Sequence, residues 1–373
     1  MPSILIITPN FKLSKASRTT KVVNDWVFGL ASQGHDVFLH HVRVKYLFFD
    51  FLPSFIRNFI ISNLDYTPPE NLDFISSDNN FSYSYIFLNR TMPKIKLGKK
   101  NKSKLVNSLP KKKFDYVVLH WHNPTIHVIK FLNNYYGNLN IVLHDFSSLS
   151  SLMKINSNKV RFFSRNKSLM MNYEKFGIKP FGLIHSSINS KFFFNQKIKT
   201  DVKKNILTVT SLIKRKNIKS IVSSIKKSEW VLNVIGEGPE KFNLKEYAED
   251  NNCNVKFHGL KNVEFIINMM DSSSIFILSS KGEAYGLVYL EAMSRGMITV
   301  SLKGEGMDDI IINGKNGFLL ESGDDIEIYK MLEYIFKLDQ LIISSISKSA
   351  IITSKRFNQK SISKDYIRNL LEA

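Results

Sequence analysis

Short apolar runs alternate with amphipathic segments along most of the chain, and this alternation constrains the fold more than any other feature. Val, Ile and Phe dominate the short runs, which is typical of parallel strands that are buried on both faces. Residues 218–225 place four apolar side chains at the spacing i, i+3, i+4, i+7, which predicts one face of a helix. Because strands that alternate with helices form parallel sheets covered on both faces, the sequence predicts an α/β protein with doubly wound sheets.

Two such sheets are expected, one in each half of the chain. A length of 373 residues suits two domains of ordinary size. The predicted strands are 4–8, 36–40, 85–88, 116–119, 141–143, 160–163 and 181–184, followed by 206–209, 231–235, 255–257, 275–278 and 298–301. We expect an N-terminal domain at 1–195, a second domain at 196–355, and a final helix at 356–373 that packs back on the first domain. Ligands of open α/β sheets bind outside the carboxyl ends of the strands, so a cleft between the domains is expected.

Composition favours a folded protein of a reducing compartment. Hydrophobic residues make up 43% of the chain and charged residues 23%, as in globular proteins. The single cysteine, Cys253, cannot form an intramolecular disulfide, which fits the cytoplasm. The first residues lack the basic region of a signal peptide, and no apolar stretch approaches the roughly 18 to 20 residues of a membrane-spanning helix.

The formal charge of +20 favours an anionic partner, although an AT-rich coding sequence that enriches lysine would explain it equally well. No recognition motif of the usual nucleic-acid-binding modules is present, so nucleic acid is not expected as a partner. Residues 46–64 are rich in Phe, Leu and Ile, and residues 94–113 hold nine lysines. Both segments fit a peripheral contact with the anionic inner face of the cell membrane. The alternatives are a core-packed helix for 46–64 and a solvated loop for 94–113.

The most informative segment is 279–293, which leads from the end of a predicted strand through a glycine-flanked loop into a helix. The first N–H groups of such a helix have no partner within it and, with the helix dipole, favour a diphosphate. Gly286 lets the backbone approach a ligand closely. Glu291 lies about one turn inside the helix and leans toward the N-terminus, where it would accept hydrogen bonds from ribose hydroxyls. Glu283, in the loop, would meet the sugar.

Glu283 and Glu291 lie eight positions apart around Ala284, Tyr285 and Gly286, and are followed by Ala-Met and by Arg-Gly at 295–296. This pattern resembles the E-x7-E signature of retaining glycosyltransferases, and most closely that of glycosyltransferase family 4. The resemblance implies the GT-B fold, in which two Rossmann-like doubly wound domains face each other across a cleft. An ordinary strand–loop–helix with two surface glutamates is the alternative.

Three further segments resemble that family in the expected order. Residues 211–217 resemble its basic loop, in which Lys216 takes the place of the lysine that holds the donor diphosphate. Ser211 stands where the family often has arginine, so Arg215 or Lys214 would substitute for that contact. Gly236, at the end of the strand 231–235, would form a wall of the base pocket. Residues 304–311 and 313–319 resemble the closing glycine-rich turn and the final strand.

In the first domain, two predicted strands end in histidine, and His144 matches the active-site histidine of the family. A histidine there would donate a hydrogen bond to a sugar hydroxyl or help to transfer the acceptor proton. His122 is the second candidate in this domain, as a residue that contacts the acceptor. The family usually has a glycine pair after the first strand, whereas this chain has none at 10–20, where Arg18 would reach an anion or the acceptor.

The resemblance implies that the enzyme moves a sugar from a nucleotide-sugar donor to a hydroxyl of a saccharide or lipid-linked acceptor with retention, without a cofactor or an obligatory metal. It further implies a role in the synthesis of cell-surface polysaccharide such as capsule, O-antigen or lipopolysaccharide. The catalytic candidates are His144, Glu283 and Lys216. The donor-binding candidates are Ser211, Arg215, Lys216, Gly236, Glu283, Ala284, Tyr285, Gly286, Leu287, Val288 and Glu291. An epimerase or hydrolase of nucleotide sugars, or a silent nucleotide- or carbohydrate-binding protein, remains an alternative.

Overall fold

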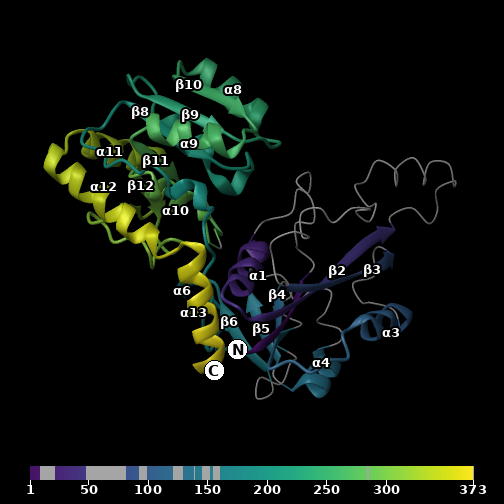
Figure 1. The fold of residues 1–373 in the computed structure, drawn as a ribbon. Helices are drawn as coiled ribbons and strands as arrows, with labels where there is room; N and C mark the ends of the chain where they lie inside the picture. Colours follow the sequence, from purple (N-terminus) through teal and green to yellow (C-terminus); the bar gives the residue numbers. More distant parts are fainter. Residues whose placement is uncertain are drawn as a thin grey trace. The chain divides into compact units, whose positions relative to one another are not determined.

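The structure of the chain is a computed structural model that describes residues 1–8, 22–47, 81–91, 99–120, 129–137, 139–144, 152–153, 160–283 and 285–372. The chain folds into two compact units (Figure 1). The N-terminal unit comprises Met1–Arg165, Met170–Ser186 and Ile362–Ala373, and the C-terminal unit comprises Asn166–Leu169 and Ser187–Ser361. The end of the chain therefore belongs to the first unit, and the predicted boundary at residue 195 lies inside the second.

The N-terminal unit holds a seven-stranded parallel sheet in the order β3-β2-β1-β4-β5-β6-β7. Its strands are β1 Ser3–Thr8, β2 Asp36–Leu47, β3 Phe81–Thr91, β4 Tyr116–His120, β5 Leu139–Leu143, β6 Val160–Ser164 and β7 Gly182–Leu183. Its described helices are α1 Val22–Ser32, α3 Lys99–Ser108, α4 Ile129–Tyr136, α6 Lys167–Glu174 and α13 Gln359–Glu372. The first residues of α6 and of α13 belong to the other unit. The central strand β1 is buried from Ile4 to Thr8, as expected of a parallel strand covered on both faces.

The C-terminal unit holds a six-stranded parallel sheet in the order β10-β9-β8-β11-β12-β13. Its strands are β8 Asn205–Val209, β9 Val231–Ile235, β10 Val255–Gly259, β11 Ile275–Leu278, β12 Ile298–Leu302 and β13 Phe318–Leu320. Its helices are η3 Ser190–Phe193, η4 Lys214–Lys216, α7 Ile218–Ser224, α8 Lys241–Asp250, α9 Val263–Ser272, α10 Leu287–Ser294, α11 Asp325–Phe336 and α12 Gln340–Lys355. In both sheets the strand order reverses beside the first strand, which is the doubly wound arrangement that the alternation predicted.

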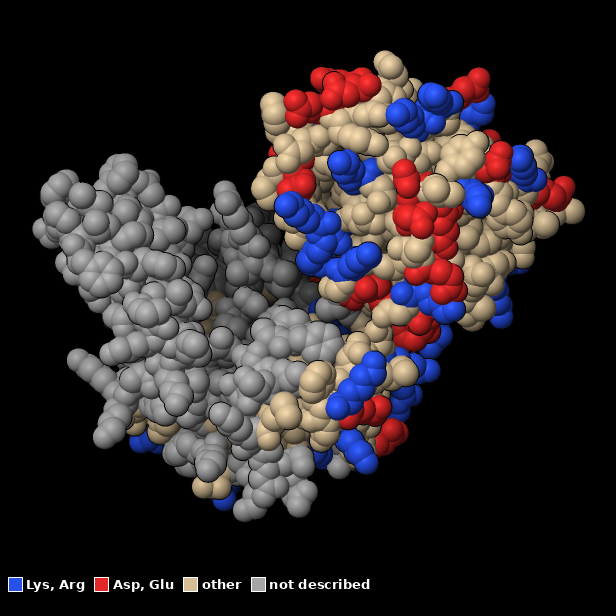
Figure 2. Space-filling view, turned by 180° about the vertical axis from the view of Figure 1, so that it is seen from behind, with Lys and Arg blue, Asp and Glu red and all other residues tan. Residues whose placement is uncertain are grey.

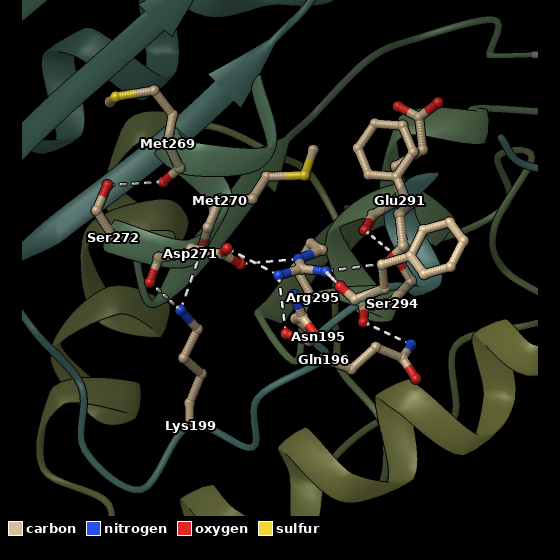
Figure 3. A network of polar contacts seen from close by, with 12 residues as sticks. Asn195, Gln196, Lys199, Met269, Met270, Asp271, Ser272, Glu291, Ser294 and Arg295 are labelled. Atoms are coloured by element: carbon tan, nitrogen blue, oxygen red, sulfur yellow. Dashed lines mark hydrogen bonds and ion pairs between the residues drawn. The ribbon is translucent and has the colours of Figure 1, made fainter. Parts of the chain in front are cut away.

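A buried arginine joins the start of the second unit to two of its helices (Figure 3). Arg295, only 2% exposed, donates from Nε and Nη2 to the carboxylate of Asp271, with both distances 2.7 Å. Its remaining N–H groups donate to the carbonyl oxygens of Phe192, Phe194 and Asn195. The guanidinium thus ties residues 192–195 to the ends of α9 and α10, with a partner for every nitrogen.

No helix among the described residues is long and apolar enough to cross a membrane. In the view of Figure 2, blue basic and red acidic side chains are both spread over the coloured part of the surface. The basic side chains of that part do not form one continuous area.

Candidate functional site in the C-terminal unit

The loop between β11 and α10 carries the E-x7-E segment, as the sequence predicted. Gly286 precedes the first residue of α10 and has φ of 75° and ψ of 56°, a left-handed conformation that favours glycine. A Cβ atom at Gly286 would lie 2.6 Å from a ring carbon of Tyr289. The glycine therefore allows both the turn and the close packing of the loop over the tyrosine ring, which is 1% exposed.

Lys216 and Glu283 form an ion pair in which the two side chains are only 10% and 14% exposed. Lys216 ends η4, which follows the carboxyl end of β8, whereas Glu283 lies in the loop after β11. These two strands are neighbours in the sheet, so their ends bring the residues together although they are distant in sequence. The structure therefore unites two of the three predicted catalytic residues in one partly buried site.

Arg215 and Lys281 join the same two segments through the backbone. The guanidinium of Arg215 donates to the carbonyl oxygen of Gly282 at 3.2 Å, and the amide of Lys281 donates to the carbonyl oxygen of Arg215 at 2.8 Å. The side chain of Arg215 is exposed, and so is Ser211. The basic loop is thus held against the E-x7-E loop by two contacts of Arg215 next to the Lys216–Glu283 pair.

Glu305 also belongs to this site, although it is not among the predicted site residues. Its carboxylate accepts hydrogen bonds from the amides of Gly282 at 2.9 Å and Glu283 at 2.6 Å. The amide of Gly306 in turn donates to the carbonyl oxygen of Glu283 at 2.9 Å. The available signal was an acidic residue between two glycines, in a turn that follows the neighbouring strand β12.

Gly236 and Gly238 lie where the end of β9 meets the segment after β8. Gly236 has φ of 140°, and a Cβ atom there would overlap the carbonyl group of Thr210. A Cβ atom at Gly238 would overlap Leu212, whose amide donates to the carbonyl oxygen of Glu237 at 2.9 Å. In the described residues these glycines allow close packing of two backbone segments. The contact of Gly236 with a base stays a prediction.

The remaining donor candidates lie on or beside α10. Tyr285 is 2% exposed, whereas Leu287, Val288 and Glu291 are half-buried. The backbone carbonyl of Glu291 accepts from Ser294 Oγ at 2.6 Å, and its carboxylate points away from the Arg295 guanidinium in Figure 3. Glu291 is therefore placed one turn inside the helix, as the spacing predicted.

His144, the third catalytic candidate, lies in the N-terminal unit directly after β5 and is 3% exposed. Its Nε2 lies 3.1 Å from Nδ1 of His120, and Nε2 of His120 lies 2.9 Å from the hydroxyl of Tyr366 in α13. Trp26 stacks on His120, with ring centroids 4.5 Å apart. Burial and the nearby charge of Arg165 lower the pKa of His120 to about 3.

Arg18, His122 and Ala284 lie outside the described residues. Within the residues that the structure describes, no group of three or more His, Cys, Asp or Glu side chains could hold a metal ion. The expectation that no cofactor or metal is required is not tested by this geometry.

Comparison with known proteins identifies the segment around the candidate site. Residues 189–349 match the family model Glycosyl transferases group 1, so the C-terminal unit carries a domain of this kind. An uncharacterized glycosyltransferase of Haemophilus influenzae is 28% identical over 156 residues, which are 40% of this chain and 44% of that protein. The lipopolysaccharide core biosynthesis glycosyltransferase LpsE of Rhizobium meliloti is 23% identical over 168 residues, 44% of this chain and 49% of LpsE. The chain thus spans less than half the length of these two relatives.

A solved structure matches the whole chain. HepE of Anabaena, crystallised in complex with UDP, aligns over 100% of both chains with a TM-score of 0.71 and 15% sequence identity. At this identity the likeness shows the fold. The prediction of a GT-B fold built from two Rossmann-like domains is therefore confirmed.

Proposed function

We propose that this chain is a retaining glycosyltransferase that moves a sugar from a nucleotide-sugar donor, bound by the C-terminal unit, to a hydroxyl of a saccharide or lipid-linked saccharide. The partly buried Lys216–Glu283 pair beside the start of α10 carries the proposal. The match of residues 189–349 to glycosyl transferases and the UDP complex of HepE support it.

The charges at this site suit the cleavage of a bond to a diphosphate. As the bond between the sugar and the donor phosphate breaks, negative charge grows on the leaving diphosphate. The Lys216 ammonium and the first N–H groups of α10 would stabilise that charge more in the transition state than in the ground state, which is what accelerates a reaction. We expect the diphosphate to share or replace the contact that Lys216 makes with Glu283.

The two glutamates would bind the neutral parts of the donor. A carboxylate repels phosphate, but it accepts hydrogen bonds from hydroxyl groups. In the proposal, Glu283 binds hydroxyls of the transferred sugar and Glu291 binds the ribose. His144 takes part in transfer, and no metal ion or cofactor is required.

Nucleotide binding and sugar transfer test the proposal together. The melting temperature is measured with UDP, GDP and ADP, and then with the corresponding glucose conjugates. A ligand at 100 times its Kd adds about 2.7 kcal/mol to the free energy of unfolding, which is about 5–11 °C for a domain of this size. Transfer from the nucleotide sugar that binds is then assayed with and without a lipid-linked acceptor.

The outcomes separate the proposed function from its alternatives. Acceptor-dependent release of nucleotide with retained anomeric configuration in the product supports it. Release that is independent of the acceptor indicates a hydrolase, and conversion of the donor sugar without release indicates an epimerase. Binding without any turnover leaves a silent nucleotide-binding protein, and no thermal shift with any nucleotide refutes the proposal.

We also propose that the acceptor is assembled into cell-surface polysaccharide at the inner face of a membrane. The likeness to LpsE and the lysines of 94–113, of which Lys111, Lys112 and Lys113 are exposed, support this. Co-sedimentation with vesicles of phosphatidylglycerol should exceed that with phosphatidylcholine and fall with added salt. Equal co-sedimentation with both would leave codon usage as the explanation of the basic charge.

A further inference from the structure

The pair of histidines in the N-terminal unit is continued by a tyrosine of the last helix. Tyr366 is 1% exposed and His120 is fully buried, and the Tyr366 hydroxyl lies 2.9 Å from His120 Nε2. His120 Nδ1 lies 3.1 Å from His144 Nε2. A hydrogen-bonded chain therefore runs from Tyr366 through His120 to His144.

The protons of this chain can be assigned because two of its members cannot change charge near neutral pH. Burial raises the pKa of the Tyr366 hydroxyl, so that Tyr366 keeps its hydrogen. The pKa of His120 is about 3, so its ring is neutral and carries one N–H only. Burial lowers the pKa of His120 most, and the positive charge of Arg165 lowers it further.

With the acceptors that the described residues offer, one arrangement gives every hydrogen of Tyr366 and His120 an acceptor. If His120 carried its hydrogen on Nε2, that hydrogen would point at the Tyr366 oxygen, and the Tyr366 hydrogen would have no acceptor among the described residues. Buried polar groups are nearly always hydrogen-bonded. The Tyr366 hydroxyl therefore donates to Nε2 of His120, and Nδ1–H of His120 donates to Nε2 of His144.

We propose that Tyr366 is a positioning residue that fixes the tautomer of His144, acting through His120. With Nε2 as an acceptor, the neutral His144 ring carries its hydrogen on Nδ1. His144 therefore acts on the sugar substrates as a hydrogen-bond donor through Nδ1–H. The inference deepens the proposed function, on which the role in transfer rests, whereas the assignment of the tautomer does not depend on it.

The surrounding aromatic rings hold this hydrogen-bonded chain in place. The indole of Trp26 stacks on His120 at an interplanar angle of 26° and meets His144 edge-on, with centroids 5.8 Å apart. Its own Nε1 donates to the carbonyl oxygen of His185 at 2.8 Å, which fixes the indole plane. Rotation of either histidine would require movement of a fully buried tryptophan.

NMR of the full chain labelled with ¹⁵N-histidine tests the tautomer directly. The signals of His144 are assigned from the spectrum of His144→Gln. We expect Nδ1 of His144 to be protonated and Nε2 unprotonated in the parent, and the second tautomer to gain population in Tyr366→Phe. Tyr136→Phe is the matched control, because it removes another partly buried tyrosine hydrogen bond of the same unit, to the carbonyl oxygen of Pro110 at 2.7 Å.

Protonated Nε2 on His144 of the parent would overturn the proposal, and this measurement does not require Tyr366→Phe to fold. An unchanged tautomer in folded Tyr366→Phe would also overturn it. In the transfer assay, Tyr366→Phe should lower kcat about tenfold with an unchanged Kd for the nucleotide, a smaller loss than the 10²-fold or more for His144 itself. The same substitution in a His144→Ala background should leave kcat unchanged; a further loss there would indicate a merely structural role. If no transfer occurs at all but the tautomer is as expected, the proposed function fails and the positioning stands.

Discussion

Replacement of Lys216 with methionine should affect stability and nucleotide binding separately. The substitution keeps most of the aliphatic side chain and removes the charge that pairs with Glu283. Loss of one partner of a buried ion pair costs about 3–5 kcal/mol, because the other charge is left without compensation. Since the two side chains are 10% and 14% exposed, we expect the lower end, about 3 kcal/mol, which is about 6–12 °C in the melting temperature.

A second variant separates the two effects. Lys216→Met with Glu283→Gln leaves no unpaired charge, so most of the lost stability should return. Binding of a nucleoside diphosphate should not return, because the charge-assisted contact with the phosphate is still missing. That contact is worth about 2–4 kcal/mol, or about 30- to 1,000-fold in Kd.

Differential scanning fluorimetry and isothermal titration calorimetry on the parent and both variants measure these quantities. The exposed pair Lys204–Glu229 supplies a control, since Lys204→Met should leave both the melting temperature and the Kd unchanged. Parent-like affinity in the double variant would show that Lys216 does not hold the diphosphate. A single variant as stable as the parent would show that the pair does not stabilise the unit.

Four other predictions concern three single substitutions and the effect of pH on stability. Glu291→Ala should raise KM for the donor with little change in kcat, because it removes a contact that is made equally in the ground state and in the transition state. An unchanged Kd for the nucleotide would show that Glu291 does not bind the ribose. His144→Ala should lower kcat about 10²-fold or more with the nucleotide Kd nearly unchanged, and intact transfer would exclude it from the active site. Arg295→Leu should lower the unfolding free energy of the C-terminal unit by about 3 kcal/mol, because the half-buried Asp271 carboxylate and three backbone carbonyl oxygens lose their hydrogen-bond donor. Calorimetry measures this, and melting like that of the parent would contradict it. The unfolding free energy of the N-terminal unit should fall as the pH is lowered from 6.5 to 4. Burial lowers the pKa of His40 to about 4 and that of His120 to about 3, so the unfolded chain takes up protons that the folded chain does not. Equal stability to chemical denaturant at both pH values would contradict this.

Periodicity predicted the elements best where strands are short and flanked by helices. The strand 231–235 has the predicted bounds in the structure, and β12 extends the predicted strand by one residue. The described residues of the segment 279–293 also follow the end of a strand and lead into a helix, as predicted. In these places the local pattern of apolar residues and the burial in the sheet agree, so that local information was sufficient.

Helices α11 and α12 were not predicted, although their start signals are present. The side chains of Asp324 and Asp339 each accept a hydrogen bond from a backbone amide at the beginning of the helix. The carboxylate of Glu327 also accepts a hydrogen bond from the amide of Gly323, in an arrangement that resembles a capping box. An aspartate before each helix, with a glutamate three residues after Asp324, is the sequence signal that would have predicted these two helix starts.

The contacts that define the candidate sites could not be predicted from local sequence. His120 and Tyr366 are 246 positions apart, and Lys216 and Glu283 are 67 apart. Their pairing depends on the strand order in the sheet and on the unit to which the last helix belongs. The sequence indicated which residue types stand at the strand ends, but not which of them meet.

The assignment of α13 to the N-terminal unit has a consequence for the order in which the chain is made. A ribosome completes residues 187–361, the main part of the C-terminal unit, before it adds Tyr366. Domains usually fold as they emerge, the N-terminal one first. Here the first unit stays without its last helix, and His120 without its hydroxyl partner, until the second has been synthesised. The unit whose synthesis starts first therefore completes its fold last, and the hydrogen-bonded chain from Tyr366 to His144 forms only after the C-terminal unit has been synthesised.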